Sequence, residues 1–272
     1  MDLGLQGKVA LVTGSERGTG SVIAQRLAEE GATVIAHGFA QGSAEPLRVQ
    51  QGAQGAQGAQ GVQHSVWGDL CSDAGAAQVA QQALAAAGRV DILVNNYGTA
   101  ADARWDAAET AVWLDMYQKN LLGAVRLIRL LTPQMRSRGW GRVIQLGTIG
   151  STQPNPLRPA YYAAKSALAS IAVTLSQELA NTGITVNTVS PGYIRTPEVE
   201  AAFRAKARRA GWEDDWASIE ARIVAQRFPN PVGRIATREE VADLVCFVAS
   251  TRAAFINGQN LRIDGGALGL VQ

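Results

Sequence analysis

The sequence predicts an α/β fold, a doubly wound parallel sheet of seven strands with helices on both faces. The first observation is that short apolar runs recur along the chain and alternate with longer helix-favouring stretches. This alternation predicts right-handed βαβ crossovers and a sheet that is covered on both faces. The second observation is that three of the runs end in glycine or in polar side chains.

The predicted strands span residues 9–13, 33–36, 63–67, 92–95, 142–146, 185–189 and 260–263. Residues 51–60 interrupt the scheme with GAQ repeats, and each glycine costs about 1 kcal/mol in a helix. We therefore expect a loose helix end or a mobile loop there. With 272 residues and 47% hydrophobic content, the chain can bury a large core, and we expect one domain over 1–272.

Composition argues against several classes of protein. The net charge of +2 is too small to indicate nucleic-acid binding. Cys71 and Cys246 form no CxxC pair, so we expect packing residues in a reducing cytosol and no metal site. No run approaches the roughly 18 apolar residues that span a membrane, and no apolar signal region precedes the first strand. These features predict a soluble, cytoplasmic protein. A basic cluster is interpreted as a solvated helix face: Arg204, Lys206, Arg208 and Arg209.

The first strand leads into a glycine-rich turn, TGSERGTG at 13–20, and then into a helical stretch. Glycines allow the backbone to approach a pyrophosphate closely, and the following helix N-terminus offers unpaired N–H groups and a positive dipole end. The spacing is GxxxGxG, and a plain turn is the alternative.

Two other strands end in polar residues, NNYG at 95–98 and Gly147-Thr148. Ligands of open parallel sheets bind outside the carboxyl ends of the strands. The sequence therefore predicts a ligand site at that edge.

Tyr161 and Lys165 are four residues apart, a spacing that places both on one helix face. A nearby ammonium favours phenolate, so we expect Lys165 to lower the pKa of Tyr161. An exposed amphipathic turn is the alternative for YxxxK taken alone. Tyr162 is a weaker candidate acid because its i+4 partner, Ser166, carries no charge. His37 and His64 are the only histidines, and we interpret both as structural or surface residues.

Taken together, these motifs resemble the short-chain dehydrogenase/reductase family in its single-domain Rossmann form, in particular members similar to 3-oxoacyl reductases. The resemblance runs nearly end to end. It rests on TGSERGTG, NNYG, QKNLLGA around Asn120, YxxxK with Thr148 thirteen positions before the tyrosine, and PGYIRT from Pro191.

The resemblance implies that Tyr161 is the proton donor, that Thr148 hydrogen-bonds the substrate oxygen, and that Asn120 anchors a water relay to Lys165. It places Asp69 at the adenine end of the cofactor and Asn95 and Gly98 beside the adenosine ribose. The implied cofactor-binding residues are Gly14, Ser15, Arg17, Gly18, Thr19, Gly20, Asp69, Leu70, Asn95, Gly98, Tyr161, Lys165, Pro191, Gly192, Ile194 and Thr196.

Two residues depart from the family pattern. Thr148 replaces the usual Ser and keeps the hydroxyl, but β-branching narrows its rotamer choice. Tyr97 replaces a small Ala, so its phenol must either stack on a neighbour or point away.

We expect NADP(H) to be preferred, with NAD(H) possible. Gly38 follows the second strand where NAD enzymes place an acid for the ribose 2′-hydroxyl, so nothing there repels a 2′-phosphate. Arg17 adds a cation that can pair with that phosphate. Phe39 stands where many NADP enzymes carry a second Arg.

The substrate, a small carbonyl compound or alcohol, is expected to meet a lid at about 193–228. Six of its residues either line that lid or pack it against the body: Thr196, Pro197, Phe203, Trp212, Trp216 and Ile219. We expect a homo-oligomer, a tetramer or a dimer, because the predicted helices 110–138 and 161–181 resemble the two that pair in this family. Two alternatives remain open, an inactive dinucleotide-binding sensor or scaffold, and an epimerase or dehydratase on the same fold.

Overall fold

The computed structural model describes residues 1–44 and 63–271, and within them seven parallel strands form one sheet in the order β3-β2-β1-β4-β5-β6-β7. The order reverses direction beside β1, so the crevice between β1 and β4 is the topological switch point of the sheet. The strands are β1 (Val9–Val12), β2 (Thr33–Gly38), β3 (His64–Trp67), β4 (Ile92–Asn95), β5 (Gly141–Leu146), β6 (Ile184–Pro191) and β7 (Asn260–Ile263).

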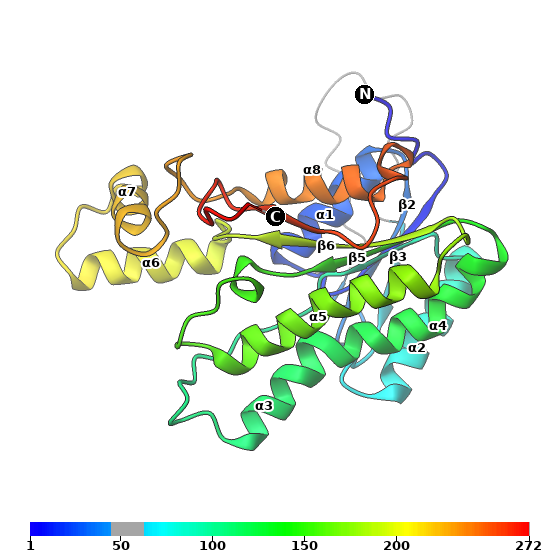
Figure 1. Ribbon diagram of the computed structural model, residues 1–272, viewed down its shortest axis with the longest axis horizontal. Helices are drawn as coiled ribbons and strands as arrows, with labels where there is room; N and C mark the ends of the chain where they lie inside the picture. The colour runs from blue at the N-terminus through cyan, green and yellow to red at the C-terminus, as the bar shows by residue number, and fades with distance from the viewer. Residues whose placement is uncertain (45–62, 272) are drawn as a thin grey trace.

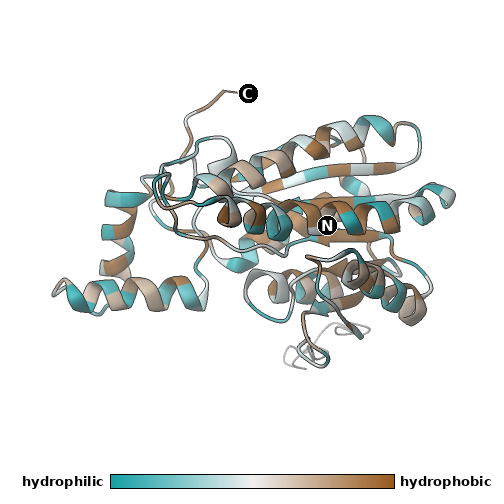
Figure 2. Ribbon diagram, turned by 90° about the horizontal axis from the view of Figure 1, so that it is seen from below, coloured by the Kyte–Doolittle hydropathy of each residue, from teal (hydrophilic) through white to brown (hydrophobic). Residues whose placement is uncertain are grey.

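Helices cover both faces of the sheet (Figure 1). α1 (Gly18–Glu29) and α8 (Arg238–Ala249) lie on one face, and α2 (Asp73–Ala87), α4 (Gly123–Ser137) and α5 (Pro159–Glu178) lie on the other. Apolar residues concentrate on the central strands between these layers (Figure 2). The sheet therefore has a buried core on each face, as the apolar strands predicted.

The predicted strands are all present, with ends that differ by one or two residues. The largest difference is at β6, which continues to Pro191 and so carries the chain directly into the PGYIRT segment. The predicted helix 110–138 is divided into α3 (Thr110–Tyr117), the π-helical turn η1 (Gln118–Leu122) and α4. Isolated π-helical turns are frequent at functional sites, and this one carries Asn120. The GAQ repeats lie outside the described residues.

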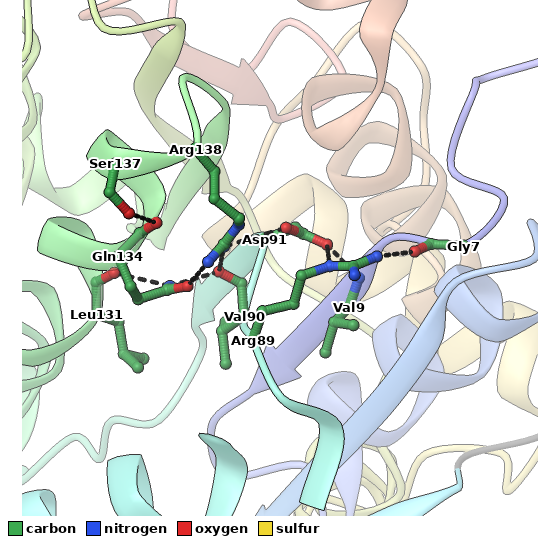
Figure 3. Close-up of polar contacts among 9 residues, drawn as sticks. All are labelled: Gly7, Val9, Arg89, Val90, Asp91, Leu131, Gln134, Ser137 and Arg138. Carbon is green, nitrogen blue, oxygen red and sulfur yellow. Dashed lines mark hydrogen bonds and ion pairs between the residues drawn. The ribbon is translucent and has the colours of Figure 1, made fainter. Parts of the chain in front are cut away.

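Asp91 joins three elements at the amino-terminal edge of the sheet (Figure 3). Its side chain is 7% exposed and accepts a hydrogen bond from Val9 N at 2.9 Å. Arg89 Nε donates to the same carboxylate at 2.9 Å, and Arg138 at the end of α4 donates at 3.2 Å. This cluster fixes β4 against β1 at the edge opposite to the predicted site.

α6 (Pro197–Arg209) and α7 (Trp216–Arg227) project beyond the carboxyl end of β6 (Figure 1). Phe203, Ala207, Ile219 and Ile223 form a small apolar core between them. The base of the pair is held by a parallel bridge in which Ala236 N donates to Tyr193 O at 3.0 Å and Arg195 N donates to Ala236 O at 2.8 Å.

Among the described residues, no helix is long and apolar enough to cross a membrane. Cys246 is buried in α8, as predicted for a packing residue. Cys71 is only partly buried, in the turn after β3, and its side chain contacts Tyr97.

Candidate active site

The glycine turn after β1 is held by His37 from β2. Gly14, whose φ of +59° favours glycine, donates its N–H to His37 Nδ1 at 3.0 Å, and His37 Nε2 donates to Gly68 O at 3.0 Å. His37 is fully buried, and burial lowers its pKa, so the neutral ring is favoured. The structural interpretation of His37 is correct, and its specific task is to join the ends of β1, β2 and β3.

Ser15 is inside this framework and not on its surface. Its buried hydroxyl donates to Val12 O at 2.8 Å and accepts from His37 N at 2.9 Å. The strand ends therefore already use its hydroxyl, and its role as a cofactor residue stays a prediction. Gly14 has likewise given its N–H to His37.

Other residues of the turn remain at least partly accessible to solvent. Gly18, with φ of +63°, and Thr19 begin α1, and Arg17 at its N-cap is exposed. Gly20 packs against Asn96, and a methyl group there would lie 2.5 Å from Gly14 O. Asn96 Nδ2 donates to Thr13 O at 2.8 Å and to Gly14 O at 3.1 Å, so the second amide of NNYG shapes the turn. Asn96 belongs to the NNYG motif, but the motif alone did not predict this role for its amide.

Tyr161 and Thr148 meet at the carboxyl edge of the sheet. Thr148 follows β5 and caps the short helix η2 (Ile149–Ser151), with Oγ1 accepting from Gly150 N at 3.3 Å. The same hydroxyl lies near the phenol of Tyr161 on α5 and acts to lower its pKa. The β-branched Thr148 therefore reaches the reactive group despite its restricted rotamers.

The phenol of Tyr161 does not have the pKa that the sequence argument expected. Burial raises it to about 12, and the smaller effects of Arg158 and the Thr148 hydroxyl act in the other direction. The predicted lowering was wrong because desolvation dominates. The ammonium of Lys165 is also directed elsewhere, to Leu146 O at 2.7 Å.

Lys165 and Asn120 converge on Gly98. A methyl group on Gly98 would lie 2.5 Å from Asn120 Oδ1 and 3.1 Å from Lys165 Nζ. Burial lowers the pKa of Lys165 to about 8. Asn120 Nδ2 donates to the carbonyls of Thr99 at 2.8 Å and Met116 at 3.0 Å, whereas its buried Oδ1 has no partner within the described chain.

The remaining predicted cofactor residues separate into exposed and buried groups. Asp69 is exposed after β3, where its carboxylate accepts from Cys71 N at 2.9 Å, and Leu70 is a core residue. Asn95 is 3% exposed at the end of β4, and both polar atoms of its side chain lack a partner among the described residues. Gly98 lies on the Lys165 side of the site, and the placement of both residues beside a ribose stays a prediction.

The PGYIRT segment leads from β6 into the helical pair. Pro191 ends β6, Gly192 packs against the ring of Phe228, and Ile194 forms the bridge to Ala236. Thr196 caps α6 by accepting from Val199 N at 3.2 Å. These contacts place the segment at the carboxyl edge of the sheet, the edge that also holds Tyr161 and Thr148.

Four of the six lid residues pack inside the helical pair, an arrangement that neither alternative described. Phe203 and Ile219 are buried between α6 and α7, and Trp212 and Trp216 pack against them. Cations cover both indoles, with Arg195 at 4.4 Å from the Trp216 ring and Lys206 at 5.2 Å from that of Trp212. The basic cluster is only partly a solvated face, since Arg204 also pairs with Glu200 at 2.8 Å and with Asp214 at 3.1 Å.

The residues present fit a dinucleotide. Glycines at 14, 18 and 20 leave space that side chains would fill, and the α1 N-terminus adjoins them. The unpaired buried Asn120 oxygen is an acceptor that a polar group or water would satisfy. A doubly wound sheet with this turn at its switch point, and a half-buried tyrosine and a buried lysine at the same edge, defines a dinucleotide-dependent oxidoreductase.

Comparison with known proteins agrees with this class. The family profile described as enoyl-(acyl carrier protein) reductase matches residues 14–267. The 3-oxoacyl-(acyl-carrier-protein) reductase of Escherichia coli is 34% identical over 264 residues, covering 97% of this chain and 98% of the relative. The protein belongs to the short-chain dehydrogenase/reductase family of NAD(P)-dependent enzymes.

Two solved structures extend the comparison. L-sorbose reductase from Gluconobacter frateurii, complexed with NADPH and L-sorbose, superposes with a TM-score of 0.89 at 31% identity, covering 100% of both chains. A 3-oxoacyl (acyl-carrier-protein) reductase from Agrobacterium tumefaciens with NADP bound gives 0.84 at 31% identity, covering 97% of this chain and 96% of that one.

Proposed function

We propose that this protein transfers a hydride between NADP(H) and a carbonyl compound or secondary alcohol, with Tyr161 as the acid and base. The observation that carries the proposal is the contact of Tyr161 with Thr148 at the sheet edge that also holds the glycine turn and Lys165. The nicotinamide cofactor, when bound, supplies the hydride.

Tyr161 is protonated at neutral pH because burial raises its pKa to about 12, so it acts as a proton donor in the direction of reduction. It gives its proton to the carbonyl oxygen, while the Thr148 hydroxyl hydrogen-bonds the same oxygen. A positioned general acid typically contributes ~10²–10⁴-fold to the rate.

Lys165 and Asn120 position the hydroxyls and the water through which the phenol of Tyr161 regains its proton. The Lys165 ammonium hydrogen-bonds the hydroxyls of the nicotinamide ribose. The free Oδ1 of Asn120 accepts from a water that bridges to Lys165, which satisfies an otherwise unpaired buried oxygen.

Three single variants test this assignment. Tyr161→Phe removes the transferable proton and leaves the ring, so turnover should collapse while NADPH binds as before in a fluorescence titration. Lys165→Ala should weaken both turnover and binding. Tyr162→Phe is the matched control, because its hydroxyl meets Asn155 at 2.9 Å and should be dispensable. An active Tyr161→Phe enzyme, or an inactive Tyr162→Phe enzyme, would remove Tyr161 from the catalytic role.

Preference for NADP(H) over NAD(H) is supported by the end of β2 and by the two NADP(H)-bound neighbours. β2 ends at Gly38, so the strand itself supplies no acid there, although a methyl group on Gly38 would lie 3.0 Å from Glu16 Oε2. Arg17 is exposed at the start of α1. The measurement is kcat/KM for NADPH and NADH on one substrate. A value for NADH equal to or above that for NADPH would contradict the preference.

The substrate reaches the site beneath α6 and α7, which serve as a lid. Support comes from their position beyond the carboxyl end of β6 and from the narrow base formed by Tyr193 and Ala236. The related enzymes act on an acyl-carrier-protein thioester and on a ketose, so a panel of 3-oxoacyl thioesters and ketoses, followed by NADPH absorbance, is the direct test.

A homo-oligomer, a tetramer or a dimer, is proposed from the outer faces of α3, α4 and α5. Leu114, Leu130 and Val173 on these helices are 64%, 41% and 44% exposed. A second copy would bury them through a two-fold interface. Light scattering that gives a monomer mass at micromolar concentration would contradict this assembly.

A further inference from the structure

Tyr97 is the residue of the cofactor crevice that neither the catalytic site nor the family pattern explains. It lies in the NNYG segment just after β4 and is half-buried, and its backbone N–H donates to Thr13 Oγ1 at 3.0 Å. Its ring lies on the glycine turn, since a methyl group on Gly14 would be 3.2 Å from Tyr97 Cα and 3.5 Å from Cδ2.

The ring of Tyr97 meets a second aromatic side chain across the turn. Phe39, just after β2, has its ring centroid 4.5 Å from that of Tyr97, with an interplanar angle of 57°. The rings of Phe39 and the buried His37 form a T-shaped pair with their centroids 5.4 Å apart. Because β2 and β4 flank β1 in the sheet, the two rings come from both sides of the glycine turn.

Neighbouring side chains hold both rings of the Phe39–Tyr97 pair in place. The Tyr97 hydroxyl lies near the thiol of Cys71 in the turn after β3, and Cys71 N is held by the Asp69 carboxylate at 2.9 Å. Phe39 is partly exposed, and Tyr97 keeps part of its surface toward solvent. The aromatic surface is therefore positioned before any ligand arrives, which reduces the ordering cost of binding.

We propose that Phe39 and Tyr97 form the aromatic surface on which the adenine base of the cofactor packs. The position of the rings at the ends of β2 and β4, on the β1-β2-β3 side of the switch point, puts them at the half of the crevice away from Tyr161. An aromatic ring recognises a purine through its π-face, and this contact is indifferent to a phosphate on the ribose.

This assignment rests on the proposed function only in requiring a dinucleotide, and it separates the affinity for the cofactor from the discrimination between NADPH and NADH. Tyr97 and Phe39 supply affinity that NADPH and NADH share, whereas the Arg17 cation supplies the discrimination between them. The aromatic contact is also insensitive to salt, while a contact between an exposed cation and a phosphate weakens as salt screens it.

The test is direct titration of the purified protein with NADPH, with NADH and with adenosine 2′,5′-bisphosphate, each followed by fluorescence or calorimetry. Tyr97→Leu keeps apolar volume and removes the π-face, and it should weaken NADPH and NADH by the same factor, roughly tenfold, at low and at high salt. Tyr97→Phe, the matched control, should stay within about twofold of the parent, because the ring remains. Arg17→Ala should weaken NADPH and the bisphosphate but leave NADH unchanged.

Each other outcome overturns the proposal. Unchanged affinity in Tyr97→Leu would make the ring a packing residue only, and tighter binding would show that the ring obstructs the crevice. Equal losses in Tyr97→Phe and Tyr97→Leu would transfer the role to the hydroxyl and Cys71. Phe39→Leu provides a second variant if Tyr97→Leu does not fold. Failure here is distinct from failure of the catalytic assignment, because Tyr161→Phe changes turnover without changing any of these affinities.

Discussion

Replacing Gly98 with Ala is the most direct perturbation of the catalytic geometry. The added methyl would lie 2.5 Å from Asn120 Oδ1, so Asn120 or the backbone must move by about 0.9 Å to restore an ordinary contact. The methyl would also lie 3.1 Å from Lys165 Nζ, which must move away by a few tenths of an ångström. Gly98 does not have a positive φ, so the effect is steric and not conformational.

The displaced group is the one that the proposed relay requires. Asn120 is held by the carbonyls of Thr99 and Met116, and a shift of this size breaks at least one of those hydrogen bonds. A misplacement of about 1 Å near a reacting centre can lower the rate by about 10²-fold, and we expect a loss of kcat of that order.

The assay is the initial rate of NADPH oxidation with a saturating carbonyl substrate, together with thermal unfolding. Gly269→Ala is the matched control, since no atom lies within 4 Å of the added methyl. Normal kcat in Gly98→Ala would refute the reasoning, because it would show that Asn120 and Lys165 need not hold the positions seen here. A low kcat accompanied by general unfolding would be visible in the melting curve.

Three further changes have defined outcomes. Thr148→Ala should lower kcat by ~10²–10³-fold, as for a lost oxyanion-type donor, and Thr148→Ser should keep most activity; near-normal turnover of the Ala enzyme would mean that another group holds the carbonyl. Asp91→Ala should reduce the free energy of unfolding in urea by about 1–3 kcal/mol, because it leaves the buried N–H of Val9 unpaired, without changing the KM for NADPH. Burial lowers the pKa of His37, so below about pH 6.5 the unfolded chain binds a proton that the native ring does not. Stability is therefore complete above that pH and falls as the pH decreases, by at most about 1.4 kcal/mol per unit; a His37→Gln variant should show a flatter profile, and an unchanged slope would contradict the role of the neutral ring.

The sequence by itself determined the sheet and the edge at which the site lies. Apolar runs separated by helical stretches leave few arrangements, because parallel strands need right-handed crossovers, and the carboxyl ends then share one edge. The spacing of Tyr161 and Lys165 on one helix gave the central pair of the candidate site in the same way.

Only the tertiary structure decided how each polar group is used. Ser15 occupies a motif position but its buried hydroxyl bonds Val12 and His37, and His37 takes the N–H of Gly14, because strand ends must satisfy their own backbone groups first. The pKa of Tyr161 likewise depends on how much water the fold excludes. The spacing of residues along a helix carries no information about that exclusion. The contact between Tyr97 and Phe39 joins two strands that are not consecutive in the sequence, so only the strand order brings those rings together.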